Sequence, residues 1–104
     1  RRVVVDVGTH AIPAVALLAE AESSILVTRA CYLALLAAQR GPAPDRIVLI
    51  EEEGRATTVK EIETSLDAPV DVAVRWHRDV ARAVDTGLLT SKPPARLVRL
   101  RALL

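Results

Sequence analysis

Near its start the chain reads Val3-Val4-Val5-Asp6-Val7-Gly8-Thr9, a run of β-branched residues that ends in an aspartate and a glycine. Three similar runs follow, at Ser24 to Thr28, Arg46 to Ile50 and Val70 to Arg75. Segments with helical character separate the runs, and strands that alternate with helices favour a parallel sheet. We therefore predict an α/β protein, a three-layer α/β/α sandwich with a mainly parallel four-stranded sheet and a C-terminal helix.

The segments between the runs carry helix start and stop signals. Thr58-Val59-Lys60-Glu61 matches a capping box, in which the threonine hydroxyl and the glutamate each satisfy a free backbone donor. Gly41 and Gly87 stand where helices are expected to end. The second segment is apolar on almost every side, which predicts that it is largely buried. The expected helices are Ile12 to Ala21, Ala30 to Arg40, one that begins after Thr58, His77 to Thr86, and Ala95 to Leu104.

Length and composition limit the class of protein. The 104 residues suffice for one α/β domain over residues 1–104, and 51% of them are hydrophobic, enough for a core. A net charge of +1 argues against a chain that coats nucleic acid or an anionic membrane. The single cysteine, Cys31, favours a reducing compartment, and no apolar run reaches the roughly 18 to 20 residues that cross a bilayer. We therefore expect a cytoplasmic protein.

Several groups of residues, taken in order along the chain, resemble the second half of MinD/ParA-like ATPases. These proteins are P-loop NTPases of the deviant Walker class, and they use ATP-driven dimerisation to position cell-division machinery, plasmids, chromosomes or other cargo. The order and spacing of the groups carry the resemblance. The groups are Val3-Val4-Val5-Asp6-Val7-Gly8, then Ala19-Glu20-Ala21-Glu22-Ser23-Ser24-Ile25-Leu26-Val27-Thr28-Arg29-Ala30, and later Ala68-Pro69-Val70, Arg75 and Val80-Ala81-Arg82-Ala83-Val84-Asp85-Thr86-Gly87.

The resemblance implies roles for four residues. Asp6 would match the aspartate at a strand end that faces magnesium and the attacking water, which makes it the candidate catalytic and metal-binding residue. Gly8 would stand near the switch that senses the γ-phosphate. Arg75 and His77 would lie in the segment that borders the adenine. Glu51-Glu52-Glu53 stands where many relatives have an asparagine, a departure that bears on adenine recognition.

The phosphate-binding loop of the family, Gly-x-x-x-x-Gly-Lys-Ser/Thr, does not occur in this sequence. That loop supplies most of the electrostatic grip on the phosphates, so we expect no cofactor for the isolated chain and no competent ATPase activity. ATP and Mg²⁺ would be bound only in a longer parent that supplies the loop. The family also places the strand of this loop between the first two runs, so its absence leaves a gap in the sheet. We expect the two runs to close against each other, to take up a strand from a partner chain, or to belong to a fragment of a longer protein, because unpaired strand edges tend to find partners.

Two functions therefore stay open. One is a MinD/ParA-like partition or positioning protein, or a fragment of one, in which Asp6 serves Mg-ATP once the loop is supplied. The other is a nucleotide-free interaction or scaffold module that binds a protein partner or itself, with Asp6 as a plain cap or loop carboxylate. Weak contact with a membrane or nucleic acid would use the basic tail, although we favour packing of the tail on the sheet. The tail cations are Lys92, Arg96, Arg99 and Arg101.

Overall fold

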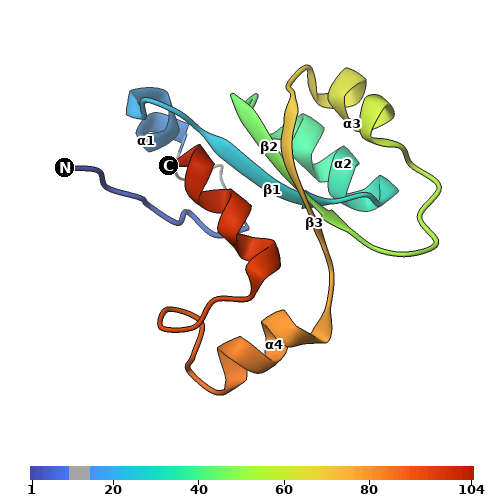
Figure 1. The fold of residues 1–104 in the computed structure, drawn as a ribbon. Coiled ribbons are helices and arrows are strands. Elements are labelled where there is room, and N and C mark those ends of the chain that lie inside the picture. The colour runs from blue at the N-terminus through green and yellow to red at the C-terminus, as the bar shows by residue number, and fades with distance from the viewer. Residues whose placement is uncertain (10–14) are drawn as a thin grey trace.

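The computed structural model describes residues 1–9 and 15–104 of the chain (Figure 1). In this described part, three strands alternate with helices. Two further helices follow the last strand, the second of them a 3₁₀-helix. The elements are α1 (Val15–Glu20), β1 (Ile25–Arg29), α2 (Tyr32–Arg40), β2 (Arg46–Glu51), α3 (Val59–Leu66), β3 (Val70–Arg75), α4 (Arg78–Asp85) and η2 (Ala95–Leu103).

The three strands form one sheet in the order β1-β2-β3, and both neighbouring pairs are parallel. The α/β class and the parallel sheet predicted from the sequence are confirmed. The register of β2 and β3 slips by one residue, because Ile47 pairs with Val70 whereas Val48 pairs with Val72. Asp71 is the extra residue of this bulge, and its carboxylate lies 3.6 Å from Nε of Arg46.

The predicted fourth strand is wrong for the residues that the structure describes. Residues 3–7 belong to no strand, and Val3, Val4 and Val5 expose 78%, 69% and 55% of their surface. A strand is stable only when a neighbour accepts its backbone hydrogen bonds, so β-branched composition alone does not make one. The predicted helix Ile12 to Ala21 is present as α1 from Val15; its first residues lie outside the described part of the chain.

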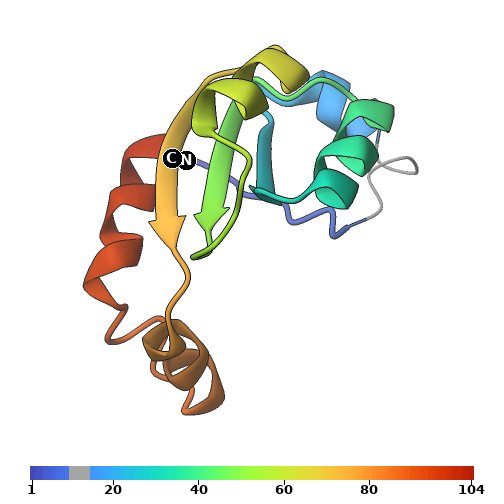
Figure 2. The same ribbon diagram turned by 90° about the vertical axis from the view of Figure 1, so that its right-hand side faces the viewer.

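One face of the sheet carries the main core (Figure 2). In a parallel sheet with this strand order, right-handed crossovers place α2 and α3 on the same face. Ile47, Leu49 and Ile62 are almost completely buried there. The cluster also includes Ala30, Leu35, Leu66 and Ala68.

The opposite face is covered only in part. Val48 and Val74 alternate with the core residues of their strands, so they point to this face, and they expose only 3% and 4% of their surface. The 3₁₀-helix η2 packs against β3 on this side (Figure 2). Val27, the register partner of Val48 on β1, remains 62% exposed. Burial on this face therefore includes Val74 of β3 and Val48 of β2 but not Val27 of β1.

The C-terminal segment packs back on the sheet, as the sequence favoured, but as a 3₁₀-helix. Its bonds span three residues, as in the bond from the Leu97 amide to the Pro94 carbonyl (2.9 Å). The predicted burial of the second helix is wrong in extent: α2 buries Leu35, whereas Tyr32 and Leu33 are 75% and 73% exposed. Apolar surface is therefore left open on α2, which packs on β1.

The predicted helix boundaries hold where local signals set them. Thr58 and Glu61 form the capping box at the start of α3, with both reciprocal bonds present. Gly87 follows α4 with φ of 72°, a left-handed conformation that glycine adopts without the Cβ penalty. α4 itself extends beyond the carboxyl end of β3, apart from the sheet (Figures 1 and 2). Within the described residues, no helix is at once long and apolar enough to span a bilayer.

Candidate functional site

Most of the charged side chains that form ion pairs lie at the carboxyl edge of the sheet. Arg29 ends β1, Glu52 follows β2, and Trp76 and His77 follow β3. The Trp76 amide donates to the Glu51 carbonyl at 2.7 Å, which fixes the end of β3 to that of β2. Ligands of open α/β sheets bind outside the carboxyl ends of the strands, so this edge is the candidate site.

Glu52 lies between two arginines at this edge. Its carboxylate accepts from Arg29 through both oxygens, with Nη2 to Oε2 at 2.8 Å, and Oε2 also accepts from Arg55 Nη2 at 3.0 Å. Hydrogen bonds from Arg29 and then Arg55 lower the pKa of Glu52 to about 2, against the smaller opposing effect of burial. The hydrogen bond to Glu52 likewise raises the pKa of Arg29. An anion that approached either guanidinium would have to compete with this carboxylate.

A second polar cluster fixes the start of α4. Nδ1 of His77 accepts from the Asp79 amide at 3.2 Å, so the imidazole caps the helix. Arg96 of η2 donates from Nε to Oδ2 of Asp79 at 3.1 Å and from Nη1 to the Arg75 carbonyl at 3.3 Å. Burial opposes ionisation of Asp79, but the hydrogen bond and the charge of Arg96 outweigh it, and the pKa of Asp79 is lowered.

The four candidate site residues implied by the resemblance lie in two separate groups. Asp6 and Gly8 lie in the exposed N-terminal segment, where the Gly8 amide donates to Oδ1 of Asp6 at 2.8 Å. This contact closes a local turn, and φ of Gly8 is 71°. Arg75 and His77 lie at the end of β3, both exposed, and join through Arg96 and Asp79. No contact recorded among the described residues links the two groups.

The sequence analysis did not predict the ion-paired group of Arg29, Glu52 and Arg55, here called the Glu52 cluster. Nothing in the sequence distinguishes the three glutamates after β2, but Glu52 is half-buried and paired, unlike its exposed neighbours Glu51 and Glu53. Arg29 was the sequence signal for this cluster. It ends the first strand, and because parallel strands end at the same edge of a sheet, its guanidinium is expected near the residues that follow the next strand. Within residues 1–9 and 15–104, no group of three or more metal-ligating side chains is placed to hold an ion.

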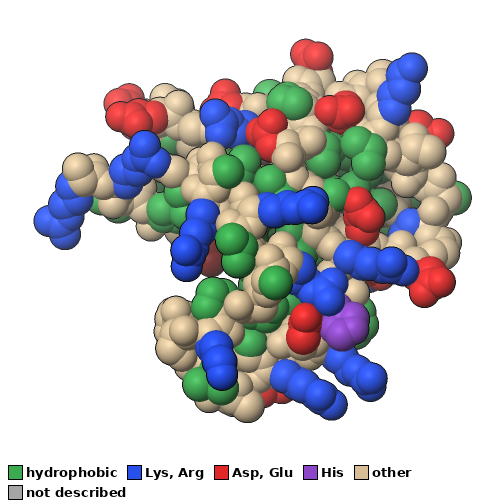
Figure 3. All heavy atoms as spheres, viewed as in Figure 1, with side chains coloured by type: hydrophobic (Ala, Val, Ile, Leu, Met, Phe, Trp, Pro, Cys, Tyr) green, Lys and Arg blue, Asp and Glu red, His purple; other side chains and the backbone are tan. Residues whose placement is uncertain are grey.

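The basic tail does not act as one free patch. Arg96 is committed to Asp79 and Arg75, whereas Lys92, Arg99 and Arg101 are exposed. Figure 3 shows cationic and hydrophobic side chains side by side over the C-terminal half on this face. Only these three exposed cations of the tail remain available to a negatively charged surface.

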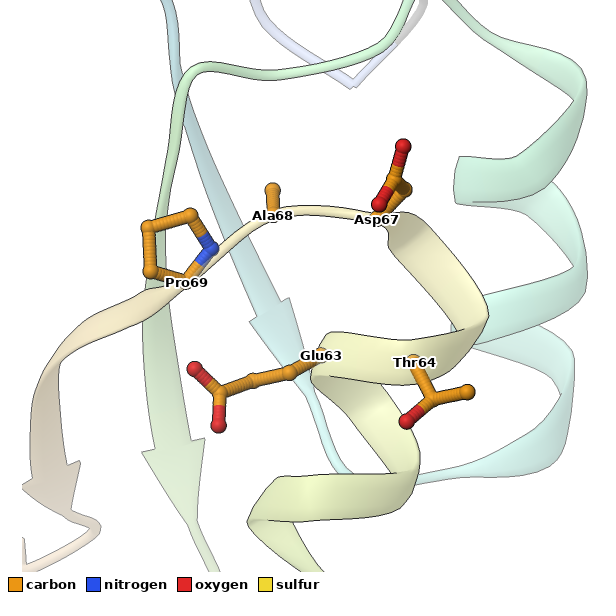
Figure 4. A pocket seen from close by; sticks show the side chains of 5 residues that line it. All are labelled: Glu63, Thr64, Asp67, Ala68 and Pro69. Carbon is orange, nitrogen blue, oxygen red and sulfur yellow. The ribbon is translucent and has the colours of Figure 1, made fainter.

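A hollow of about 450 Å³ lies at the opposite edge of the sheet, where α3 passes into β3 (Figure 4). Glu63, Thr64, Asp67, Ala68 and Pro69 line it. The Glu63 carboxylate accepts from the Val70 amide at 2.9 Å, so this side chain anchors the start of β3. The hollow sits at the amino end of the strand, and two of its lining side chains already bond to the backbone, Glu63 to the Val70 amide and Thr64 to the Lys60 carbonyl.

The fold and the edge together define an α/β protein with a parallel sheet and an ion-paired carboxyl edge. Comparisons of the chain with protein-family models, curated proteins and solved structures found no match.

Proposed function

We propose that this chain is a MinD/ParA-like partition or positioning protein, or a part of one, and that by itself it acts through protein contacts. The observation that supports this proposal best is the parallel sheet whose carboxyl edge gathers the Glu52 cluster and the Arg75–His77 segment. We propose a cytoplasmic location, which such a role requires. The order of the sequence motifs along the chain is the second support.

ATP hydrolysis is not assigned to the isolated chain. The sequence has no phosphate-binding loop, and Asp6 lies exposed in a segment outside the sheet. In a parent that supplies the loop, we propose that residues 3–7 become the fourth strand and α1 completes the three-layer sandwich. Asp6 would then stand at a strand end, where a carboxylate can hold Mg²⁺ and orient water.

A nucleotide-free interaction module is the second candidate, and a specific surface favours it. Trp76, Val84 and Leu88 are 63%, 56% and 48% exposed on and beside α4, which stands apart from the sheet. Clustered exposed apolar side chains commonly mark protein-binding surfaces. In this alternative the Glu52 cluster only stabilises the edge of the sheet.

A chimera tests the first proposal. The phosphate-loop half of a MinD/ParA-like ATPase is joined ahead of Arg1, and the melting temperature is measured with and without millimolar Mg-ATP. We expect a rise of several degrees in the chimera, because a ligand that binds only the folded state stabilises it, and no rise in the isolated chain. The change Asp6→Ala should abolish the rise.

Asp85→Ala is the matched control, because Asp85 is an exposed acid on α4. It should leave the nucleotide-dependent rise intact. A folded chimera that Mg-ATP does not stabilise would refute the nucleotide-dependent role and leave the interaction module. A rise that survives Asp6→Ala would remove Asp6 from the site.

A further inference from the structure

The outer edge of β1 is open in the described part of the chain. β1 is the first strand of the order β1-β2-β3 and pairs only with β2. An edge strand presents unpaired backbone N–H and C=O groups, and proteins usually protect such an edge with charges, proline or a covering element. β1 reads Ile25-Leu26-Val27-Thr28-Arg29, and its one charged side chain is bound to Glu52.

Exposed apolar side chains lie on β1 itself and on α2, the helix that packs on it. Val27 is 62% exposed on the face that η2 leaves uncovered. On the other face α2 packs on β1, and its Tyr32 and Leu33 remain 75% and 73% exposed. Backbone groups and apolar surface are therefore available together, which is what an added strand requires.

Each copy of the chain also has a segment with the composition of a strand that belongs to no sheet. Residues 3–7, Val3-Val4-Val5-Asp6-Val7, equal β1 in length and consist of β-branched residues apart from Asp6. In an extended conformation Val3, Val5 and Val7 share one side, so they can form a continuous apolar row with Val27. The exposure of Val3, Val4 and Val5 shows that their own chain does not bury them.

We propose that residues 3–7 of one copy add to the β1 edge of a second copy, and that the second copy does the same in return. The structure leaves this segment off its own sheet although the edge is open, which favours an occupant from another chain. A reciprocal exchange makes two identical contacts, closes with two-fold symmetry and leaves neither edge exposed. The inference does not depend on the nucleotide role proposed above.

The oligomeric state of the full chain is the first test. Sedimentation equilibrium over a range of concentrations should show a monomer–dimer equilibrium. Val27→Lys and, separately, Val5→Lys should each raise the dimer dissociation constant about tenfold or more, because either places a charge in the added-strand contact. Val59→Lys is the matched control, because Val59 on α3 is 41% exposed and belongs neither to β1 nor to residues 3–7, and it should leave the constant unchanged.

Cross-linking then identifies the paired segments. In a Cys31→Ser background, protein with Val5→Cys is mixed with protein with Val27→Cys and treated with a short bifunctional thiol reagent. We expect a cross-linked heterodimer that forms faster than either homodimer. A matched mixture of Val59→Cys with Val27→Cys should give no such preference.

Three results would overturn the inference. The first is a monomer at every concentration. The second is a dimer that Val5→Lys and Val27→Lys leave intact. The third is an intrachain cross-link in the double variant Val5→Cys/Val27→Cys without the heterodimer in the mixture, because it would place the segment on its own β1.

Discussion

Glu52 shows how the tertiary environment changes one side chain. In sequence it is the middle of three glutamates, and only the fold brings Arg29 and Arg55 to it. Their hydrogen bonds favour the ionised carboxylate, so its pKa falls to about 2 from the ordinary value of 4.5 for a glutamate. Because the folded pKa lies below the unfolded one, the resulting stability is present above about pH 4.5 and is lost as the pH falls towards 2.

Glu52→Gln should therefore reduce the dependence of the free energy of unfolding on pH in this acidic range. Denaturant unfolding of the native sequence should show a free energy of unfolding that falls between pH 5 and pH 2, and the variant should show a smaller fall. The control Glu53→Gln removes an exposed neighbouring acid and should keep the native profile. Equal profiles for the native sequence and the Glu52 variant would mean that the arginines do not hold this carboxylate in solution.

Among the elements, α3 has its start defined by local chemistry. The Glu61 amide donates to the Thr58 hydroxyl at 3.3 Å, and the Thr58 amide donates to the Glu61 carboxylate at 2.9 Å. These bonds satisfy two backbone donors that the helix cannot pair internally. The helix then delivers Ile62 and Leu66 to the core.

Thr58→Ala should lower the free energy of unfolding by about 1 kcal/mol, the usual cost of losing a threonine cap. Urea denaturation measures this difference. Thr64→Ala is the control in the same helix, because the Thr64 hydroxyl only bonds back to the Lys60 carbonyl at 2.9 Å. It should be neutral or slightly stabilising, since alanine has the higher helix propensity.

The 3₁₀-helix η2 depends on one long side chain for its polar attachment. Arg96 joins it both to Asp79 at the start of α4 and to the Arg75 carbonyl at the end of β3. Arg96→Ala should loosen η2, which limited trypsin digestion at Arg99 and Arg101 would detect as faster cleavage. Lys60→Ala, a change on the exposed part of α3, should leave the cleavage rate at these sites unaltered. Unchanged cleavage in the Arg96 variant would show that apolar packing on β3 suffices.

The whole molecule is a sheet with one well-filled face and one partly covered face. Ile47, Leu49 and Ile62 fill the first, whereas Val27 is left exposed on the second. Stability should therefore depend strongly on the side of α2 and α3 and weakly on α4, which stands apart from the sheet. Hydrogen exchange is expected to be slowest in β2, which is hydrogen-bonded on both sides.

Ile62→Val should reduce the free energy of unfolding by about 0.5–1.5 kcal/mol, the usual cost of one buried methylene and its cavity. Val84→Ala removes two carbons from an exposed position and should change it by less than about 0.5 kcal/mol. Chemical denaturation compares the two variants directly. Equal effects would place α4 in the cooperative core.

Prediction from sequence succeeded where neighbours in the chain determine the outcome. β3 begins and ends where its alternating residues predicted, and the Thr58 capping box is present. It failed for residues 3–7, whose strand would need a partner that composition does not provide. The Glu52 cluster was missed for a related reason, because Arg29 and Glu52 are 23 residues apart and meet only through strand pairing.

Local patterns in this chain suffice to specify an α/β protein with parallel strands, because β-branched runs, helix caps and glycine stops act over a few residues. Three features came from packing alone: the open edge of β1, the uncovered Val27 and the ion pairs at the carboxyl edge. Each depends on which segments lie beside one another in space. That choice is set by burial and hydrogen bonding across the whole molecule, which no single stretch of residues encodes.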